Sequence, residues 1–241
     1  SKIISLDKST GKAVSSLAIK GDIRSSVTYS AETDSYYVSS KAGYVYKFSM
    51  DSSGKLGSLK TYTAPGAVTA TPVVYNGRLY VGCQNGSAGK FIVLDAKTMK
   101  EIYTADMQGY PQASMLISTG YEQTSGKIYI YSTYNAKPGG ITAFEDSQGQ
   151  TSVVKTELFT PDTDMQQYCI STVSAGEDGT LYYKNDSGNI FALSTHTTND
   201  NDTEKEENNN TGSSEKKPSF FQKIIDFFKN IFAKIFGIFS K

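Results

Sequence analysis

The sequence predicts an all-β protein in which four-stranded sheets follow one another along most of the chain, as in the blades of a β-propeller. Two observations support this prediction. Stretches in which Tyr, Val and Ile alternate with polar residues are bounded by Gly, Asn, Asp and Ser, a pattern typical of strands and their turns. One such strand recurs around Tyr37, Tyr80, Tyr129 and Tyr182, at intervals close to the roughly 40–50 residues of a propeller blade. We therefore expect a partial ring with about four blades visible.

Each repeat contains three strands that the alternation indicates in order. The strand with the recurring tyrosine, called here the repeat tyrosine, is expected at residues 34–38, 77–81, 126–130 and 179–183. The next strand is expected at 44–48, 91–95, 141–145 and 189–193, and the preceding one at 26–29, 71–74, 115–118 and 171–174. The second repeat is the clearest, with strands expected at 68–75, 78–84, 90–95 and 101–105. Its Asn76-Gly77 turn favours a hairpin because both residues tolerate positive φ.

The two ends of this repeat region carry incomplete blades. Residues 2–20 resemble the last two strands of a blade, and residues 170–194 resemble the first three. Either residues 13–19 complete a small ring, or further blades precede the chain, and the second alternative is favoured because closed propellers commonly have more blades than are visible here. The chain enters a strand pattern at once, with no starting Met and no apolar leader, so we expect it to begin inside a longer protein.

Three segments carry a more specific resemblance. Residues 4–12 read Ile-Ser-Leu-Asp-Lys-Ser-Thr-Gly-Lys, residues 92–103 repeat the pattern, and residues 71–82 contain Thr-Pro-Val-Val-Tyr-Asn-Gly-Arg-Leu-Tyr-Val-Gly. They resemble pyrroloquinoline-quinone-like propeller repeats, a family that includes enzymes and also the periplasmic lipoprotein scaffold of outer-membrane protein assembly. The resemblance covers residues 1–194 and implies the fold, not one function. The docking Trp of the family is missing: Tyr103 and Ser15 take its place in two repeats, and Met99 replaces a motif Gly, so we expect the packing between blades to be either weaker or differently built.

Composition divides the chain into three parts. The sequence has 24 basic and 24 acidic residues, and a chain without net charge is unsuited to general nucleic-acid binding. Residues 1–194, the expected propeller segment, are themselves balanced in charge. Residues 195–217 are acidic and lack large apolar side chains, so we expect a disordered linker. Residues 218–241 are basic and rich in Phe and Ile.

The apolar residues of the segment 218–241 recur every three or four positions, which predicts an amphipathic α-helix. Polar residues interrupt the apolar ones too often for a helix that spans a membrane. We expect the apolar face to bind a membrane surface or a partner helix, and docking onto the propeller remains a third alternative. The binding residues expected on this face are Phe220, Phe221, Ile224, Phe227, Phe228, Ile231, Phe232, Ile235, Phe236 and Phe239. This tail also resembles the C-termini of surface proteins from Gram-positive gut bacteria.

No group of residues specifies a reaction. The single His, His196, falls in the expected linker and cannot be held against a nucleophile, so we predict no catalytic residues and a protein that is not an enzyme. Cys83 and Cys169 are interpreted as buried side chains, with a disulfide as the alternative. The acidic turns at Asp162-Thr163-Asp164, Asp178-Gly179 and 185–189 lack the spacing of a calcium loop, so we predict no metal site. The resemblance implies that a quinone cofactor would need a stacking aromatic, usually Trp, and an adjacent Cys–Cys pair, and the sequence has neither, so we predict no cofactor. The alternative is a cofactor-binding or enzymatic quinoprotein-like propeller.

Tyrosines provide the candidate recognition surface. Tyr110, Tyr121, Tyr131, Tyr134 and Tyr168 fall in the less regular repeats, where they either pack between blades or form a binding face. The long loop 132–140 is the best candidate for recognition, through Tyr131, Tyr134, Asn135 and Lys137. The sequence as a whole predicts a non-catalytic binding or adhesion scaffold of the bacterial cell envelope. We expect an extracellular, surface-associated protein whose propeller binds a protein or glycan and whose tail binds a membrane or partner.

Overall fold

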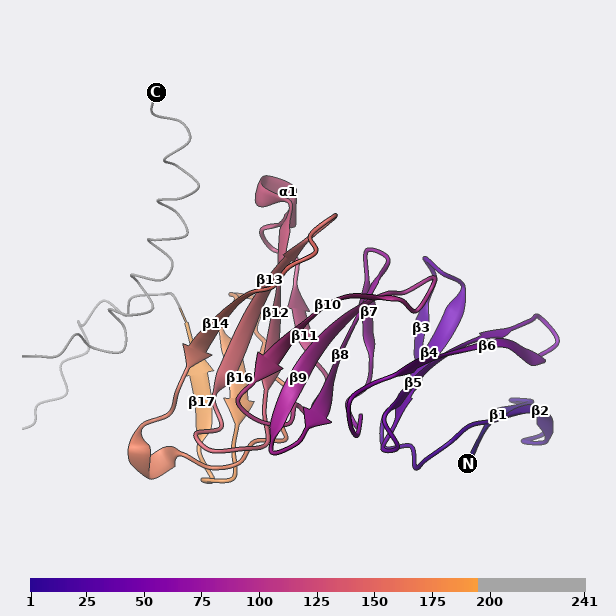
Figure 1. Ribbon diagram of the computed structural model, residues 1–241, viewed down its shortest axis with the longest axis horizontal. Coiled ribbons are helices and arrows are strands. Elements are labelled where there is room, and N and C mark those ends of the chain that lie inside the picture. Colours follow the sequence, from indigo (N-terminus) through magenta and orange to yellow (C-terminus); the bar gives the residue numbers. More distant parts are fainter. Residues whose placement is uncertain (195–241) are drawn as a thin grey trace, which may run out of the picture. The chain divides into compact units, whose positions relative to one another are not determined.

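The computed structural model describes residues 1–194, and these residues form an all-β fold (Figure 1). The predicted linker at 195–217 and the predicted helix at 218–241 lie outside the described residues. The first of two compact units comprises Ser1–Ser174 and Tyr182–Phe191, and the packing described below belongs to this unit. In the second unit, the segment Ala175–Leu181 contains a turn closed by a hydrogen bond from the Gly176 N–H to the Thr180 carbonyl, at 2.8 Å.

Three four-stranded antiparallel sheets make up most of the first unit, and we call them blades 1 to 3. Blade 1 consists of β3 (Thr28–Ser30), β4 (Ser35–Ser40), β5 (Tyr44–Met50) and β6 (Leu56–Thr63). Blade 2 consists of β7 (Val73–Tyr75), β8 (Arg78–Asn85), β9 (Ala88–Asp95) and β10 (Glu101–Met107). Blade 3 consists of β11 (Leu116–Ser118), β12 (Lys127–Thr133), β13 (Ile141–Ser147) and β14 (Val154–Phe159). In each blade the strands pair in chain order, as the sequence predicts for a partial propeller.

Incomplete sheets flank these blades in the chain. Strands β1 (Lys2–Leu6) and β2 (Ala13–Ala18) pair with each other and form a two-stranded sheet. Strands β15 (Ser174–Ala175), β16 (Leu181–Lys184) and β17 (Ile190–Leu193) form a three-stranded sheet. Both agree with the predicted positions of the incomplete repeats.

The first strand of blade 2 is shorter than predicted. It was expected over residues 68–75, but β7 covers only Val73–Tyr75. The residues before it bond to blade 1 instead: the Val68 N–H donates to the Ser40 carbonyl at 3.2 Å, and Ser39 Oγ donates to the Ala70 carbonyl at 2.6 Å. Pro72 has no N–H to give to a ladder, so the strand begins after it.

Two short helical turns are additions that the sequence pattern did not predict. The helix α1 (Glu122–Ser125) lies between β11 and β12, and the 3₁₀ turn η1 (Thr163–Met165) follows β14. A helix of four residues is too short to show a periodic apolar face. Gly126 ends α1 at φ 69°, a left-handed conformation that suits glycine.

The core lies between neighbouring sheets, and blade 2 is covered on both faces. Leu79, Val81 and Cys83 of β8 pack toward blade 1, whereas Tyr80 on the same strand packs toward blade 3. Figure 1 shows the blades side by side in this order, from β3–β6 through β7–β10 to β11–β14. Tyr103, which takes the place of the family Trp, is buried in the core between blades 2 and 3, so the missing indole is replaced by a smaller ring.

The repeated turn at Asp7 and Asp95 has the same hydrogen bonds in both copies. Asp7 Oδ1 accepts from the N–H and the hydroxyl of Thr10 at 2.7 and 2.8 Å, and Asp95 Oδ1 accepts from those of Thr98 at 2.6 and 2.7 Å. These bonds favour the ionised carboxylate, so the pKa of both Asp side chains is lowered. Met99 has φ 64° where Gly11 has φ 68°, and its side chain enters the core between blades 1 and 2.

Candidate functional site

The candidate recognition loop 132–140 begins on β12 and ends at β13. The structure buries Tyr134 completely, and Tyr131 lies on β12, half-buried. Asn135 is half-buried, and Lys137 is exposed. Burial raises the pKa of Tyr131 and of Tyr134 to about 12, so both hydroxyls are neutral at physiological pH. Of the four predicted residues, Lys137 and part of Asn135 therefore form the surface, and the two tyrosines support it.

Hydrogen bonds and close backbone contacts hold this loop in place. Thr133 Oγ1 donates to the Ser171 carbonyl at 2.6 Å, and the Asn135 N–H donates to the Tyr110 carbonyl at 2.8 Å. A Cβ atom at Gly139 would lie 1.8 Å from the Gln167 carbonyl oxygen, and one at Gly140 would lie 2.0 Å from the Phe159 carbonyl oxygen. Glycines are needed at both positions because the backbone of the loop lies directly against its neighbours.

The neighbouring segment 166–170 presents two large side chains to solvent. Tyr168 is 49% exposed and Ile170 is 58% exposed, whereas Cys169 between them is buried. The Asp186 N–H donates to the Tyr168 carbonyl at 2.9 Å, which fixes the backbone beneath these side chains. We call residues 134–140 together with 166–170 the loop face. Lys137 is the only charged residue of these two segments.

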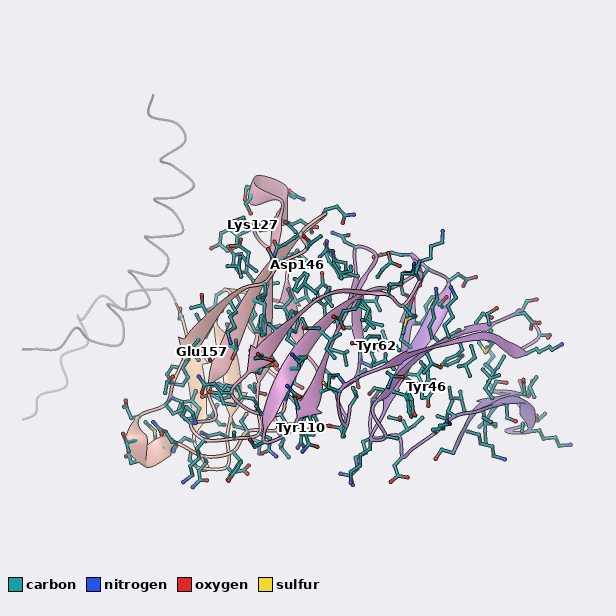
Figure 2. The ribbon with its side chains drawn as sticks, in the orientation of Figure 1. Tyr46, Tyr62, Tyr110, Lys127, Asp146 and Glu157 are labelled. Atoms are coloured by element: carbon teal, nitrogen blue, oxygen red, sulfur yellow. The ribbon has the colours of Figure 1, made fainter. Side chains whose placement is uncertain are left out.

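The other tyrosines singled out in the sequence have different roles. Tyr110 is half-buried, and its hydroxyl shares a hydrogen bond of 2.9 Å with the hydroxyl of Thr69. Figure 2 shows Tyr110 at the opposite end of the sheets from Lys127 and Asp146. Tyr121 packs edge to face against the ring of Tyr129, with centroids 5.9 Å apart. Tyr168 is thus the predicted aromatic whose side chain is exposed on the loop face. The sequence does not predict Ile170 as part of this surface, because an isolated apolar residue in a loop carries no periodic signal.

A buried polar cluster links blades 2 and 3. Arg78 Nη1 on β8 donates to Asp146 Oδ1 on β13 at 2.9 Å, and its Nη2 donates to the Gln150 carbonyl at 2.7 Å. The Tyr80 hydroxyl donates to Asp146 Oδ2 at 2.7 Å. Burial, together with the adjacent carboxylate, raises the pKa of Tyr80 far above its ordinary value. The cluster is closed to solvent, so its role is to join the blades.

The turns and cysteines considered as chemical sites are structural. Asp178 Oδ1 accepts from the Thr180 N–H at 3.0 Å, and Asn185 Oδ1 accepts from the Ser187 N–H at 3.0 Å, as in ordinary polar turns. Within residues 1–194, no three His, Cys, Asp or Glu side chains gather as a metal-binding group. Cys83 and Cys169 are both free and buried, which confirms their interpretation as buried side chains rather than a disulfide. Burial raises the pKa of Cys83 to about 11.

A separate cleft of about 330 Å³ opens where β2 meets blade 1. Its walls are mostly apolar and come from Ala18, Ile19, Lys20, Tyr44, Tyr46, Leu59 and Thr61. Lys20 Nζ lies 5.9 Å from the centre of the Tyr44 ring, and the Tyr46 hydroxyl accepts from the Lys20 N–H at 2.9 Å. The Tyr46 hydroxyl also donates to the Lys20 carbonyl at 3.2 Å, so its hydrogen bonds are made within the protein. No helix within the part of the chain that the structure describes is long and apolar enough to cross a membrane.

The sheets and their order define a β-propeller segment, and comparison with solved structures confirms this class. The quinohemoprotein alcohol dehydrogenase from Comamonas testosteroni is similar, with a TM-score of 0.57 and 14% identity over 80% of this chain and 38% of that chain. The Dos1 propeller has a TM-score of 0.55 and 16% identity, over 79% of this chain and 49% of that chain. BamB from Moraxella catarrhalis has a TM-score of 0.51 and 12% identity, over 79% of this chain and 54% of that chain.

The chain therefore has the fold of pyrroloquinoline-quinone-like β-propellers, as the resemblance in the sequence predicts. It spans about half the length of these solved structures, or less. No protein-family model matches the sequence, and no curated protein sequence matches it. The similar structures include both an alcohol dehydrogenase and BamB, so the fold alone favours neither an enzyme nor a scaffold.

Proposed function

We propose that the protein is a non-catalytic binding scaffold whose loop face takes a protein partner. The observation that carries the proposal is the exposed pair Tyr168 and Ile170, held on a fixed backbone beside Lys137. A few residues supply most of the binding energy at protein interfaces, and Tyr is among the most frequent of them. A rigid surface also loses less entropy on binding. Because the glycine contacts at Gly139 and Gly140 already order the loop, little entropy remains to be lost on binding.

The chemistry of the face defines the partner. An apolar side chain of the partner would cover Tyr168 and Ile170, and an acidic group would lie against Lys137, the only charge of the two segments. A glycan could also stack on the Tyr168 ring, but Ile170 offers a sugar no polar contact. The pairing of Tyr with Ile therefore favours a protein over a glycan.

The proposal places the protein at the outside of a bacterial cell. This placement is supported by the resemblance of residues 218–241 to the C-termini of bacterial surface proteins, and their basic, Phe- and Ile-rich pattern predicts attachment to a membrane surface or a partner helix. The competing function, a quinoprotein-like enzyme or cofactor binder, shares the fold but has no support in the residues of the loop face.

Peptide selection tests the proposed site. A library of random peptides displayed on phage is selected on the immobilised full chain, and the enriched peptides are titrated against variants. We expect Tyr168→Ala and Ile170→Ala each to weaken binding by about 30-fold, the effect of losing about 2 kcal/mol at a hot spot. Tyr29→Ala is the matched control, because Tyr29 is an equally exposed tyrosine on β3 of blade 1.

Two outcomes would contradict the proposal. The loop face is not the binding site if the selected peptides bind Tyr168→Ala and Tyr29→Ala alike. If a glycan array gives specific signals that Tyr168→Ala abolishes and no peptide is enriched, the ligand is a glycan. Saturable binding of pyrroloquinoline quinone, followed by ultraviolet-visible absorption with and without Ca²⁺, would instead support the quinoprotein-like alternative.

A further inference from the structure

One buried cation of the protein has no acidic partner. Within residues 1–194, the buried charged side chains are Lys47, Arg78 and Asp146, and the last two form an ion pair with each other. Lys47 of β5 is only 8% exposed, and no carboxylate in this part of the chain lies within ion-pair distance of it. Its ammonium donates instead to the Lys97 carbonyl at 2.9 Å, in the turn between β9 and β10. A buried charge is unfavourable unless an opposite charge compensates it.

A second lysine adds to this unfavourable charge. Lys60 of β6 is the direct cross-strand partner of Lys47, and its ammonium approaches the same Lys97 carbonyl at 3.4 Å. Like charges directly opposite each other destabilise a sheet. The pKa of Lys47 is lowered by burial and next by the charge of Lys60, while Asp95 raises it and Lys97 lowers it further. Three positive charges therefore gather where blade 1 meets the turn of blade 2.

The carboxylates of the adjoining turn and strand already have partners. Asp95 Oδ1 accepts from the N–H and the hydroxyl of Thr98. Glu101 Oε2 accepts from the hydroxyl of Tyr62 at 2.6 Å, and Tyr62 is labelled in Figure 2. Lys60 and Lys97 are both exposed, so an anion from solvent can reach the three lysines.

The packing of the blades does not require charges at these positions. Directly paired residues form a row across β4, β5 and β6 of blade 1, which consists of Tyr37, Lys47 and Lys60. The corresponding row of blade 2, across β8, β9 and β10, consists of Tyr80, Val93 and Tyr103. Each row faces the following blade, which the hydroxyl of its repeat tyrosine reaches by a hydrogen bond. Because an uncharged row joins blades 2 and 3, the two lysines of blade 1 are not needed to join blades 1 and 2.

We propose that Lys47, Lys60 and Lys97 bind a doubly charged oxyanion, a phosphate or sulfate group, between blades 1 and 2. The charge balance sets this class, because three lysine charges less the one of Asp95 leave two positive charges to neutralise. A phosphate monoester carries about 1.5 to 2 negative charges at pH 7, whereas a carboxylate carries one. Each ammonium has three N–H donors, so Lys47 and Lys60 can bond to the Lys97 carbonyl and still donate to the anion.

Titration of the full chain with inorganic phosphate, at constant ionic strength, tests the site. The side-chain signals of the lysines are followed by NMR, because they report both the binding and the charge of each ammonium. We expect the signals of Lys47, Lys60 and Lys97 to shift in a saturable way, and the pKa of Lys47 to rise when the anion is bound. Sulfate should behave like phosphate, whereas acetate, with one charge, should bind about tenfold more weakly.

Single variants distinguish this site from a general attraction of anions to lysines. Lys60→Gln and Lys47→Met each remove one charge, and each is expected to weaken phosphate binding about tenfold. Lys41→Gln is the matched control, because Lys41 is an exposed lysine of blade 1 outside the site, and this variant should bind phosphate as the wild type does. Lys47→Met should also be at least as stable as the wild type in urea without phosphate, because it removes a buried charge, and phosphate should stabilise it less.

A short phosphoserine peptide identifies the source of the anion. Tighter binding of the peptide than of inorganic phosphate supports a phosphorylated partner, and equal binding supports a free anion. The proposal is overturned if phosphate causes no saturable shift of the three lysine signals, or if acetate binds as tightly as phosphate. It is also overturned if Lys47→Met and Lys60→Gln leave the binding unchanged, or if Lys41→Gln weakens it as much as they do.

Discussion

The buried ion pair between Arg78 and Asp146 gives a sharp test of how the blades are joined. Asp146→Asn removes the negative charge with little change of shape and leaves the Arg78 guanidinium buried between β8 and β13. Breaking a buried pair by removing one partner costs about 3–5 kcal/mol. We expect about 3 kcal/mol, the low end of this range, because the Asn side chain can still accept one hydrogen bond.

This loss is measurable as a change in the free energy of unfolding in urea, and as a fall in Tm of about 6–12 °C for a unit of this size. The control is Asp106→Asn, which breaks the exposed pair between Lys90 and Asp106, formed at 2.8 Å, and should cost no more than about 1 kcal/mol. The double variant Arg78→Met with Asp146→Leu removes both charges and should recover part of the stability, because the buried Tyr80 hydroxyl still loses its acceptor. Equal losses for Asp146→Asn and Asp106→Asn would refute the reasoning.

Three further predictions follow from the loop, the buried acids and the tail. Gly139→Ala should destabilise the protein and raise hydrogen exchange in loop 132–140, because its Cβ would collide with the Gln167 carbonyl oxygen. The control Gly77→Ala is also at positive φ but has nothing within 4 Å of its Cβ, so it should lower the free energy of unfolding by only about 1 kcal/mol. Equal losses of stability for the two variants would contradict the loop contact. Folded-state pKa values raised to about 11 for Cys83 and about 12 for Tyr134 mean that the unfolded chain ionises first, so the free energy of unfolding should be level between about pH 6 and 8 and should fall from about pH 8 to 12. Urea titrations across that range check this, and a stability that rises with pH would disprove it. Full-length chain should co-sediment with anionic liposomes while a chain ending at residue 217 should not, and equal sedimentation would remove the membrane role of residues 218–241.

Much of the fold could be predicted from the sequence because the strands repeat. The alternation of side chains and the Asn76-Gly77 turn predict the bounds of β8 and β9 to within two residues. Such a strand is specified locally, because its alternate side chains face the two neighbouring sheets and a two-residue turn fixes its start. The truncated β7 was not predicted, because the contacts of Val68 and Ala70 with blade 1 are made between residues far apart in the chain.

The site was less predictable than the fold. Tyr134 and Tyr168 are the same residue type in similar polar surroundings, yet one is buried in the core and the other is open to solvent. The difference depends on how closely the loop lies against its neighbours, which only the backbone geometry at Gly139 shows. Likewise, nothing local links Arg78 to Asp146, which are separated by 68 positions and meet through the packing of two blades.

The repeat tyrosines were recognised by their spacing, but the reason for them is a contact. In blades 1 and 2 the hydroxyl reaches the following sheet, through the Ala96 carbonyl or the Asp146 carboxylate. The sequence pattern shows that the tyrosine recurs, but it does not show what its hydroxyl bonds to. The acceptor is a backbone oxygen in one blade and a side-chain oxygen in the other, so the acceptors share no sequence motif.

The side-by-side arrangement of the blades has a consequence for local unfolding. Blade 2 is covered on both faces, by the clusters around Val81 and around Phe91, whereas the β1–β2 hairpin rests on blade 1 by one face only. When each unit contacts only its neighbours, resistance to opening is set by how many neighbours it has. Amide protons of β8 and β9 should then be the last to exchange with deuterium, and a protease should attack the terminal hairpin while the middle of the stack is still intact.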